Sequence, residues 1–163
     1  MFLTDDISTQ LGTFALVPQI VNAVKIPVIA AGGIADASGV SAALALGAVA
    51  VQIGTTYMRC AEATTSQLHR AALQSESSRH TAITRIFSGR PARGIVNRLM
   101  REFGAMNHVA PSFPLAASAL APLRAKAERL GHAGFSPLWC GQNATGCLNI
   151  PASELTHRLV RWL

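Results

Sequence analysis

The sequence predicts an α/β fold, a partial (β/α)8 barrel that comprises the last two strands, together with an added helical region. Two short apolar segments, residues 26–34 and 48–55, each run directly into glycine, and a helix-like stretch separates them. A strand, a helix and a strand in that order need a crossover connection, so the two strands are expected to be parallel. Such barrels often build a phosphate site from the loops after their last two strands. The two segments therefore suggest a cofactor that carries a phosphate.

Chain length limits how much of a barrel is expected. The chain has 163 residues, whereas a complete eight-fold barrel usually needs about 250. If the two glycine-ended segments are the last two strands, six strands should precede residue 26, and the sequence has no room for them. Half of the residues are hydrophobic and only 13% are charged, so we expect a sizeable core rather than disorder.

A loop and a helix are predicted before the first strand. Residues 5–13 are mostly polar, and apolar residues recur at helical spacing over residues 14–24. Pro27 then opens a β-branched run, Val28–Ile29, which is typical of a strand buried on both faces.

A second helix is predicted before the second strand. Three apolar residues are expected on its inner face: Val40, Ala43 and Leu44. Gly47 stands where a left-handed residue would end this helix. Residues 49–53 then read as the second strand.

Helices and loops, with no further strands, are predicted after Thr55. A helix over 65–74 precedes a loop over 88–94, and an amphipathic helix over 95–103 ends at Gly104. The apolar side of the amphipathic helix is expected to face inward: Ile95, Val96, Leu99, Met100 and Phe103. Its polar side is expected to face solvent: Asn97, Arg98, Arg101 and Glu102.

The last third of the chain is predicted to hold two more helices. One spans 122–130 and stops at Gly131, and the other follows a loop over 135–149. Three residues are predicted to form the apolar face of the final helix: Leu155, Leu159 and Trp162. The elements are assigned to three parts of the chain: the C-terminal part of the barrel over 1–64, the added helical region over 65–134, and a return loop with a barrel helix over 135–163.

Composition and charge argue against nucleic-acid and membrane functions. The net charge is +6, and five arginines fall within residues 85–101. Aromatic residues are few and no nucleic-acid recognition motif accompanies the arginines, so nucleic-acid binding is not expected. Residues 1–6 lack the basic and apolar regions of a signal peptide, and the apolar run 40–53 is too short to span a membrane.

The three cysteines are odd in number and lack the spacing of a metal site. They are Cys60, Cys140 and Cys147. We expect buried free thiols, which fit a reducing compartment and a cytoplasmic location.

The Gly32–Gly33 turn is the first candidate binding site. Glycine lets a backbone approach a ligand, and residues 31–34 could offer successive N–H donors to an anion, helped by the start of the following helix. A glycine pair after a strand is more often structural, but Gly54 and Thr55 end the next strand in a similar way. The Thr55 hydroxyl could donate to the anion, or it could cap the helix that follows.

The segment Trp139–Gln142 is the second candidate. Trp139 offers a flat apolar face, Gly141 permits close approach, and Gln142 can both donate and accept hydrogen bonds. These properties suit a binding site at the edge of a planar ring. They suit equally a tryptophan that simply packs beside a turn.

The remaining polar residues form no catalytic pattern. The five histidines are scattered and are expected on the surface or within helices, and Asp36 and Ser38 are expected to cap a helix. Arg90 and Arg93 could bind an anion, although salt bridges to a neighbouring helix are preferred. The sequence shows no carboxylate pair, nucleophile elbow or metal-binding cluster.

Several segments, taken in order, together resemble one known family. They are Ile-Pro-Val-Ile-Ala-Ala-Gly-Gly-Ile-Ala-Asp over 26–36, Ala-Leu-Ala-Leu-Gly-Ala over 43–48, Val-Gln-Ile-Gly-Thr over 51–55, the opening residues 1–14, Ser-Gly-Arg-Pro-Ala-Arg-Gly over 88–94 with Asn97, and Trp-Cys-Gly-Gln over 139–142. This ordered set resembles the C-terminal half of the nitronate monooxygenases, also called 2-nitropropane dioxygenases. Many FMN barrels share the glycine–glycine strand, so only the whole ordered set of segments is specific to this family.

The resemblance implies a TIM-barrel FMN domain and an enzyme that oxidises alkyl nitronates with O₂ to a carbonyl compound and nitrite. It implies that the FMN phosphate is held by Ala31, Gly32, Gly33, Gly54 and Thr55. It also implies three residues near the flavin ring: Trp139, Gly141 and Gln142. The implied partners are the alkyl nitronate and O₂, without a metal.

The base of the family is a histidine in a Gly-Gly-His-Arg-Gly stretch that precedes the segment starting here at Met1, and this sequence lacks that stretch. We therefore expect an N-terminally truncated chain with no catalytic residue of its own, weak or absent turnover, and self-association through unpaired strands. Two alternatives stay open. One is an FMN-dependent enoyl-acyl carrier protein reductase, which needs a reduced nicotinamide, and the other is an inactive flavin-binding fragment.

Overall fold

The computed structural model describes residue 4 and residues 6–162, which form two compact units. The first unit joins the described residues up to Gln10 with Ser66–Cys140. The second joins Leu11–Thr65 with the described residues from Gly141 onward. The expected absence of a signal peptide, and part of the predicted loop over 5–13, fall on residues outside this description. Within the rest of that loop, Ile7–Thr9 form a short 3₁₀ helix, η1.

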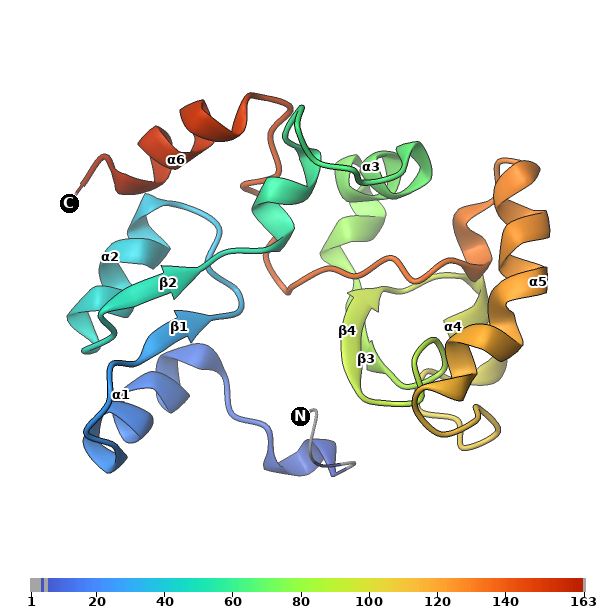
Figure 1. Ribbon diagram of the computed structural model, residues 1–163, viewed down its shortest axis with the longest axis horizontal. Coiled ribbons are helices and arrows are strands. Elements are labelled where there is room, and N and C mark those ends of the chain that lie inside the picture. The colour runs from blue at the N-terminus through green and yellow to red at the C-terminus, as the bar shows by residue number, and fades with distance from the viewer. Residues whose placement is uncertain (1–3, 5, 163) are drawn as a thin grey trace. The chain divides into compact units, whose positions relative to one another are not determined.

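Two parallel strands lie at the centre of the second unit (Figure 1). Strand β1 (Ile29–Ala31) pairs in parallel with β2 (Ala50–Gln52), and helix α2 (Ala37–Ala45) connects them. Helix α1 (Thr13–Ala23) precedes β1. The predicted order of helix, strand, helix and parallel strand is therefore confirmed for this unit.

The burial predicted for the first strand is wrong. Ile29 is 61% exposed, and among the three residues of β1 only Ala30 is buried. Ala30 packs with Val17, Ala43 and Ala48 in a small apolar cluster. Parallel strands are normally covered on both faces, so this sheet presents more apolar surface to solvent than the predicted barrel would.

Gly47 ends α2 in the left-handed conformation that the sequence predicts. Its φ is +96°, and it follows the C-cap residue Leu46. A Cβ at Gly47 would also lie 2.9 Å from Cγ1 of Val21, a residue of α1. Glycine is thus required both by the backbone and by the close packing of α1 on this turn.

Helix α6 (Ala152–Val160) covers another side of α2. Leu155 and Leu159 are buried beside Val40 and Cys60, as their predicted stripe requires. The prediction that Trp162 extends this stripe is wrong, because Trp162 lies beyond the end of the helix and is 57% exposed.

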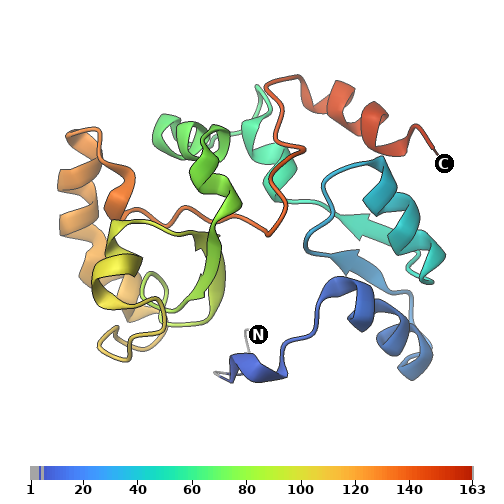
Figure 2. The same cartoon turned by 180° about the vertical axis from the view of Figure 1, so that it is seen from behind.

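The first unit contains a hairpin that the sequence pattern did not predict (Figure 2). Strand β3 (Thr81–Thr84) pairs antiparallel with β4 (Ala92–Ile95), so that Thr81 lies opposite Ile95. The predicted loop over 88–94 therefore ends in a strand. The expected amphipathic helix is shorter than predicted, because α4 spans Arg98–Phe103.

The predicted orientation is wrong for Asn97, the N-cap of α4, and for Phe103, the last residue of the helix. Asn97, predicted to face solvent, is 5% exposed, because its side chain caps α4 by accepting from the N–H of Met100. Phe103, predicted to face inward, is 54% exposed. Gly104 ends the helix as predicted, with a φ of +82°.

The remaining helices of the first unit are α3 (Gln67–Gln74), the 3₁₀ helices η3 (Glu76–Arg79) and η4 (Ala133–Phe135), and α5 (Leu115–Arg129). Helix α5 begins before the predicted start at Pro122, which lies in its interior. Gly131 follows the C-cap residue with a φ of +77°, as predicted.

Candidate functional site

The carboxyl ends of β1 and β2 open into one cavity of about 310 Å³ within the second unit. Three stretches line it: residues 31–34, residues 52–55, and Gly141 with Asn143. Ligands of parallel α/β sheets bind beyond the carboxyl ends of the strands. The cavity brings together most of the predicted site residues: Ala31, Gly32, Gly33, Gly54, Thr55 and Gly141.

The Gly32–Gly33 turn supplies backbone donors to this cavity. Gly32 has a φ of +105° and Gly33 a φ of +74°, which residues with side chains rarely adopt. Among the residues that the structure describes, the amide N–H groups of Gly33 and Ile34 meet no hydrogen-bond acceptor. Successive free amides in such a turn form a concavity that binds anions.

The start of the following helix carries an acidic cap. The carboxylate of Asp36 caps α2 by accepting from the N–H of Gly39 at 2.8 Å. The expected cap by Asp36 is confirmed, whereas Ser38 lies within the helix. The expectation that the helix start helps to bind the anion stays a prediction, and the carboxylate of Asp36 at this position would oppose an anion.

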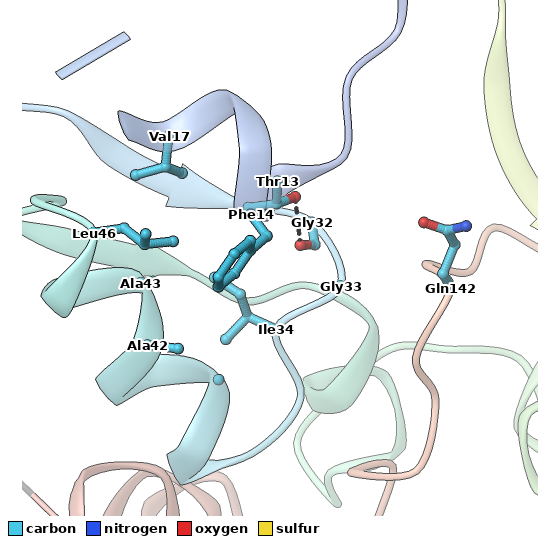
Figure 3. Close-up of a pocket in the computed structure, with 11 residues that line it drawn as sticks. Thr13, Phe14, Val17, Gly32, Gly33, Ile34, Ala42, Ala43, Leu46 and Gln142 are labelled. Carbon is cyan, nitrogen blue, oxygen red and sulfur yellow. Dashed lines mark hydrogen bonds between the residues drawn. The ribbon is translucent and has the colours of Figure 1, made fainter. Parts of the chain in front are cut away.

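Thr13 holds the glycine turn through its side chain. The hydroxyl donates to the carbonyl oxygen of Gly32 at 2.8 Å (Figure 3). It also lies 3.3 Å from the carbonyl oxygen of Ala31. Thr13 is the first residue of α1. Nothing in the sequence marked Thr13 as a site residue, because it lies 19 residues before Gly32 and carries no motif of its own.

Thr55 connects the end of β2 to the returning C-terminal segment. Its side-chain oxygen accepts from the N–H of Gly141 at 2.9 Å, and its carbonyl oxygen accepts from the thiol of Cys147 at 3.2 Å. The alternative role as a helix cap is wrong, since Gly54 is the N-cap of the 3₁₀ helix η2 (Thr55–Arg59) and makes no side-chain cap bond. The hydroxyl proton of Thr55 remains available for donation.

Asn143 lines the cavity, although its sequence context did not mark it as a site residue. Its side-chain oxygen accepts from both the N–H and the hydroxyl of Thr145, at 3.0 Å and 2.6 Å. These bonds fix the amide plane, and the Nδ2 donor has no partner among the described residues. The spacing Asn-x-Thr is a weak signal for such a turn, and it gives no indication of a cavity.

The other two predicted ring contacts lie outside this lining. Gln142 borders a neighbouring cavity of about 240 Å³, where Phe14 and Ile34 point toward one another (Figure 3). Trp139 belongs to the first unit, where its ring meets that of Phe87 edge-on at 5.9 Å.

One histidine is buried in the first unit. His69, in α3, is 9% exposed and its Nε2 lies 3.0 Å from the carbonyl oxygen of Trp139. Burial lowers the pKa of His69, although the hydrogen bond to Trp139 partly opposes the effect. The three cysteines are buried free thiols, as predicted, and burial raises the pKa of Cys140.

Arg93 does not form the helix salt bridge preferred by the sequence analysis. Its guanidinium donates across the hairpin to the carbonyl and hydroxyl oxygens of Thr81, both at 3.2 Å. The guanidinium of Arg90 lies over the ring of Phe113 at 5.9 Å. Within residues 4 and 6–162, no three metal-binding side chains gather, and no helix is long and apolar enough to cross a membrane.

Two parallel strands joined by a helix, with a glycine-lined cavity at their carboxyl ends, define an α/β protein with a candidate ligand site beyond its strands. The family model described as nitronate monooxygenase matches residues 4–161. The chain therefore belongs to the nitronate monooxygenase family.

Individual relatives agree with this assignment. The nitronate monooxygenase of Paraburkholderia phytofirmans is 39% identical over 100% of this chain and 45% of its own length. A probable nitronate monooxygenase of Staphylococcus aureus is 37% identical over 92% of this chain and 42% of its own length. The chain thus spans less than half the length of these relatives.

Two solved structures resemble the chain closely. The nitroalkane oxidase of Streptomyces ansochromogenes has a TM-score of 0.88 and 36% identity, over 97% of this chain and 45% of that one. FabK of Thermotoga maritima has a TM-score of 0.75 and 31% identity, over 93% of this chain and 49% of that one.

Proposed function

We propose that the chain forms the phosphate end of the FMN site in a flavin-dependent enzyme that oxidises alkyl nitronates with O₂ to a carbonyl compound and nitrite. The observation that carries this proposal is the glycine-lined cavity, with the unpartnered amides of Gly33 and Ile34 in its wall. Membership of the nitronate monooxygenase family supports the reaction class.

The cavity fits a phosphate group in size and in chemistry. Its volume of about 310 Å³ is at the lower end of small-molecule pockets, so it suits one end of a cofactor. None of the described lining residues is acidic, and several offer neutral donors. Neutral N–H and O–H donors stabilise a phosphate dianion, whereas a nearby carboxylate would repel it.

The lining residues divide into donors and residues that give access. The amides of Gly33 and Ile34, the hydroxyl of Thr55 and the side-chain amide of Asn143 would donate to the phosphate oxygens. Gly32 and Gly54 leave room for the phosphate because they carry no side chain. When bound, FMN supplies the ring that accepts electrons from the substrate. Gly141 and Gln142, with Trp139, remain the proposed neighbours of that ring.

Proton removal is proposed to depend on residues that this sequence does not contain. The Gly-Gly-His-Arg-Gly stretch of the family does not occur in the 163 residues, and none of the residues lining the cavity is a histidine. A nitronate is already the conjugate base of a nitroalkane, so its oxidation needs no further proton abstraction. We therefore expect any turnover by this chain to favour the nitronate over the nitroalkane.

The first experiment measures FMN binding by visible absorbance and by quenching of flavin fluorescence on the purified chain. Gly33→Ala places a side chain at a positive φ in the cavity wall and should weaken FMN binding. Gly131→Ala is the matched control, because Gly131 has a similar φ of +77° against +74° and because an added Cβ would meet no atom within 4 Å at either position. Equal FMN affinity in both variants, or no FMN binding by the parent chain, would overturn the proposed site.

The second experiment tests the reaction. The FMN-loaded chain is mixed with an alkyl nitronate in air, and nitrite release is measured against free FMN. Nitrite release above the free-flavin rate supports the proposed reaction. FMN binding without nitrite release leaves an inactive flavin-binding fragment, and consumption of a reduced nicotinamide with an enoyl thioester would favour the reductase alternative.

A further inference from the structure

We propose that Thr13 is a positioning residue for the phosphate site. Its hydroxyl fixes the Gly32–Gly33 peptide so that the N–H of Gly33 is presented to the cavity. This inference rests on the proposed function, because the group positioned is a donor to the FMN phosphate.

The anchoring contact is a short, long-range hydrogen bond. The Thr13 hydroxyl donates to the carbonyl oxygen of Gly32 at 2.8 Å, and the two residues are 19 positions apart in the chain. Thr13 begins α1, so its backbone is held by a regular helix of 11 residues. The hydroxyl therefore joins a turn of two glycines to a rigid element.

Peptide geometry transmits this contact to the donor. In a trans peptide the C=O and N–H groups of one plane point in opposite directions. The one cis bond among the described residues is Phe113–Pro114, so the Gly32–Gly33 peptide is trans. When Thr13 holds the Gly32 carbonyl on one side, the N–H of Gly33 must point to the other side.

The two faces of the turn support this arrangement. Thr13 lines the 240 Å³ cavity on one face of the glycine turn, whereas it is not among the residues lining the 310 Å³ cavity. Gly32 and Gly33 line both cavities. The Gly33 amide, directed away from Thr13, is thus directed toward the proposed phosphate site.

The turn needs an anchor of this kind because two glycines have little to fix them. Glycine loses more conformational freedom on ordering than any other residue. A Cβ at Gly33 would meet no atom within 4 Å, and a Cβ at Gly32 would meet only Oγ1 of Thr13, at 3.2 Å. A hydroxyl that holds the preceding carbonyl lowers the entropy that phosphate binding would otherwise have to overcome.

The test compares Thr13→Val with Thr13→Ser for binding of FMN and of riboflavin, which lacks the phosphate. Valine keeps the branched shape without the hydroxyl, and serine keeps the hydroxyl. We expect Thr13→Val to weaken FMN binding about fivefold, the effect of one neutral hydrogen bond. Riboflavin binding should not change, and Thr13→Ser should bind FMN within about twofold of the parent chain.

Each outcome separates the alternatives. An unchanged FMN affinity in Thr13→Val, or an equal loss for FMN and riboflavin, overturns the positioning role while the proposed function stands. Failure of the parent chain to bind FMN overturns the proposed function and this inference with it. If Thr13→Val does not fold, as judged by circular dichroism, the pair Thr13→Ala and Thr13→Ser makes the same comparison.

Discussion

The side-chain oxygen of Thr55 accepts a hydrogen bond from the backbone N–H of Gly141 at 2.9 Å, although 86 positions separate the two residues. The bond attaches the returning C-terminal segment to the end of β2, where both residues line the same cavity. It also orients the Thr55 hydroxyl, since the oxygen accepts from Gly141 while the proton is left to donate. One side chain therefore both closes the cavity wall and offers a donor to it.

Replacing Thr55 by valine should remove both effects. The part-buried N–H of Gly141 would lose this hydrogen bond, which costs about 1 kcal/mol of unfolding free energy, and FMN affinity should fall by a factor of about five or more. Thr55→Ser keeps the hydroxyl and is the control for both measurements. Denaturant unfolding and FMN titration measure the two effects. A valine variant with the affinity and stability of the serine variant would contradict this role.

Replacing Asn143 by aspartate should weaken FMN binding more than replacing it by alanine. The aspartate can keep the bonds from Thr145, but it removes the amide donor and brings a negative charge to the cavity wall. Repulsion of a phosphate at this range should reduce affinity about tenfold or more. Because salt screens exposed charges, the loss should shrink as ionic strength rises. If riboflavin binding falls as much as FMN binding, the effect does not arise at the phosphate.

Gly146→Ala should destabilise the second unit. A Cβ at Gly146 would collide with the carbonyl oxygen of Ala35 and lie 2.9 Å from Cγ2 of Thr56, a fully buried residue. Overpacking of this kind typically costs about 1–3 kcal/mol. Gly12→Ala is the control, because a Cβ there meets nothing within 4 Å. The midpoint of urea unfolding measures the difference, and equal midpoints would show that the chain relaxes around the added methyl.

Asn97→Ala should destabilise the first unit by about 2 kcal/mol, the upper range for loss of a helix cap. Asn97 is buried, accepts from the N–H of Met100 at 3.2 Å and donates to the carbonyl oxygen of Ser136 at 2.8 Å. Asn97→Asp keeps the cap but loses the donor, so it should fail to restore full stability. Thermal unfolding measures both variants, with substitution of the exposed Asn22 by alanine as the control.

Acidification should destabilise the chain through His69. Burial holds its pKa below the usual value of 6.5, so between these two pKa values the unfolded chain binds a proton that the folded chain does not. The free energy of unfolding should therefore fall as pH drops below about 6.5, until the folded pKa is reached. His69→Gln should remove this part of the pH dependence, and substitution of the exposed His132 by glutamine should not. Urea unfolding from neutral pH to about pH 5.5 makes the comparison.

The elements of the second unit could be predicted because their local signals agree with their packing. The apolar spacing of α1, the left-handed Gly47 and the two strand–glycine segments each fix one element. The β3–β4 hairpin could not be predicted, since its strands are short and β4 holds Ala92 and Gly94, which are residue types depleted in strands. Its pairing depends on contacts across the hairpin, which no periodicity records.

The candidate site was predictable only where glycine carries the signal. In the sequence, the Gly32–Gly33 turn and Gly54 indicate positions where the backbone can approach a ligand closely. Thr13 and Asn143 line or support the site through hydrogen bonds whose partners depend on the fold, so common residue types gave no sign of their position. The exposure of Ile29 was also hidden, because an apolar run looks the same whether or not another layer covers it.

The second unit is discontinuous, because Leu11–Thr65 are completed by a segment that starts at Gly141. During synthesis the glycine turn and both strands emerge from the ribosome long before Gly141 and Asn143. The growing chain therefore contains an incomplete cavity wall while residues 66–140 of the first unit are translated. Closing the wall brings together residues 86 positions apart, and such non-local contacts are slower to form than local ones. The proposed cofactor would therefore meet a closed cavity only after the segment from Gly141 has been synthesised and has folded back.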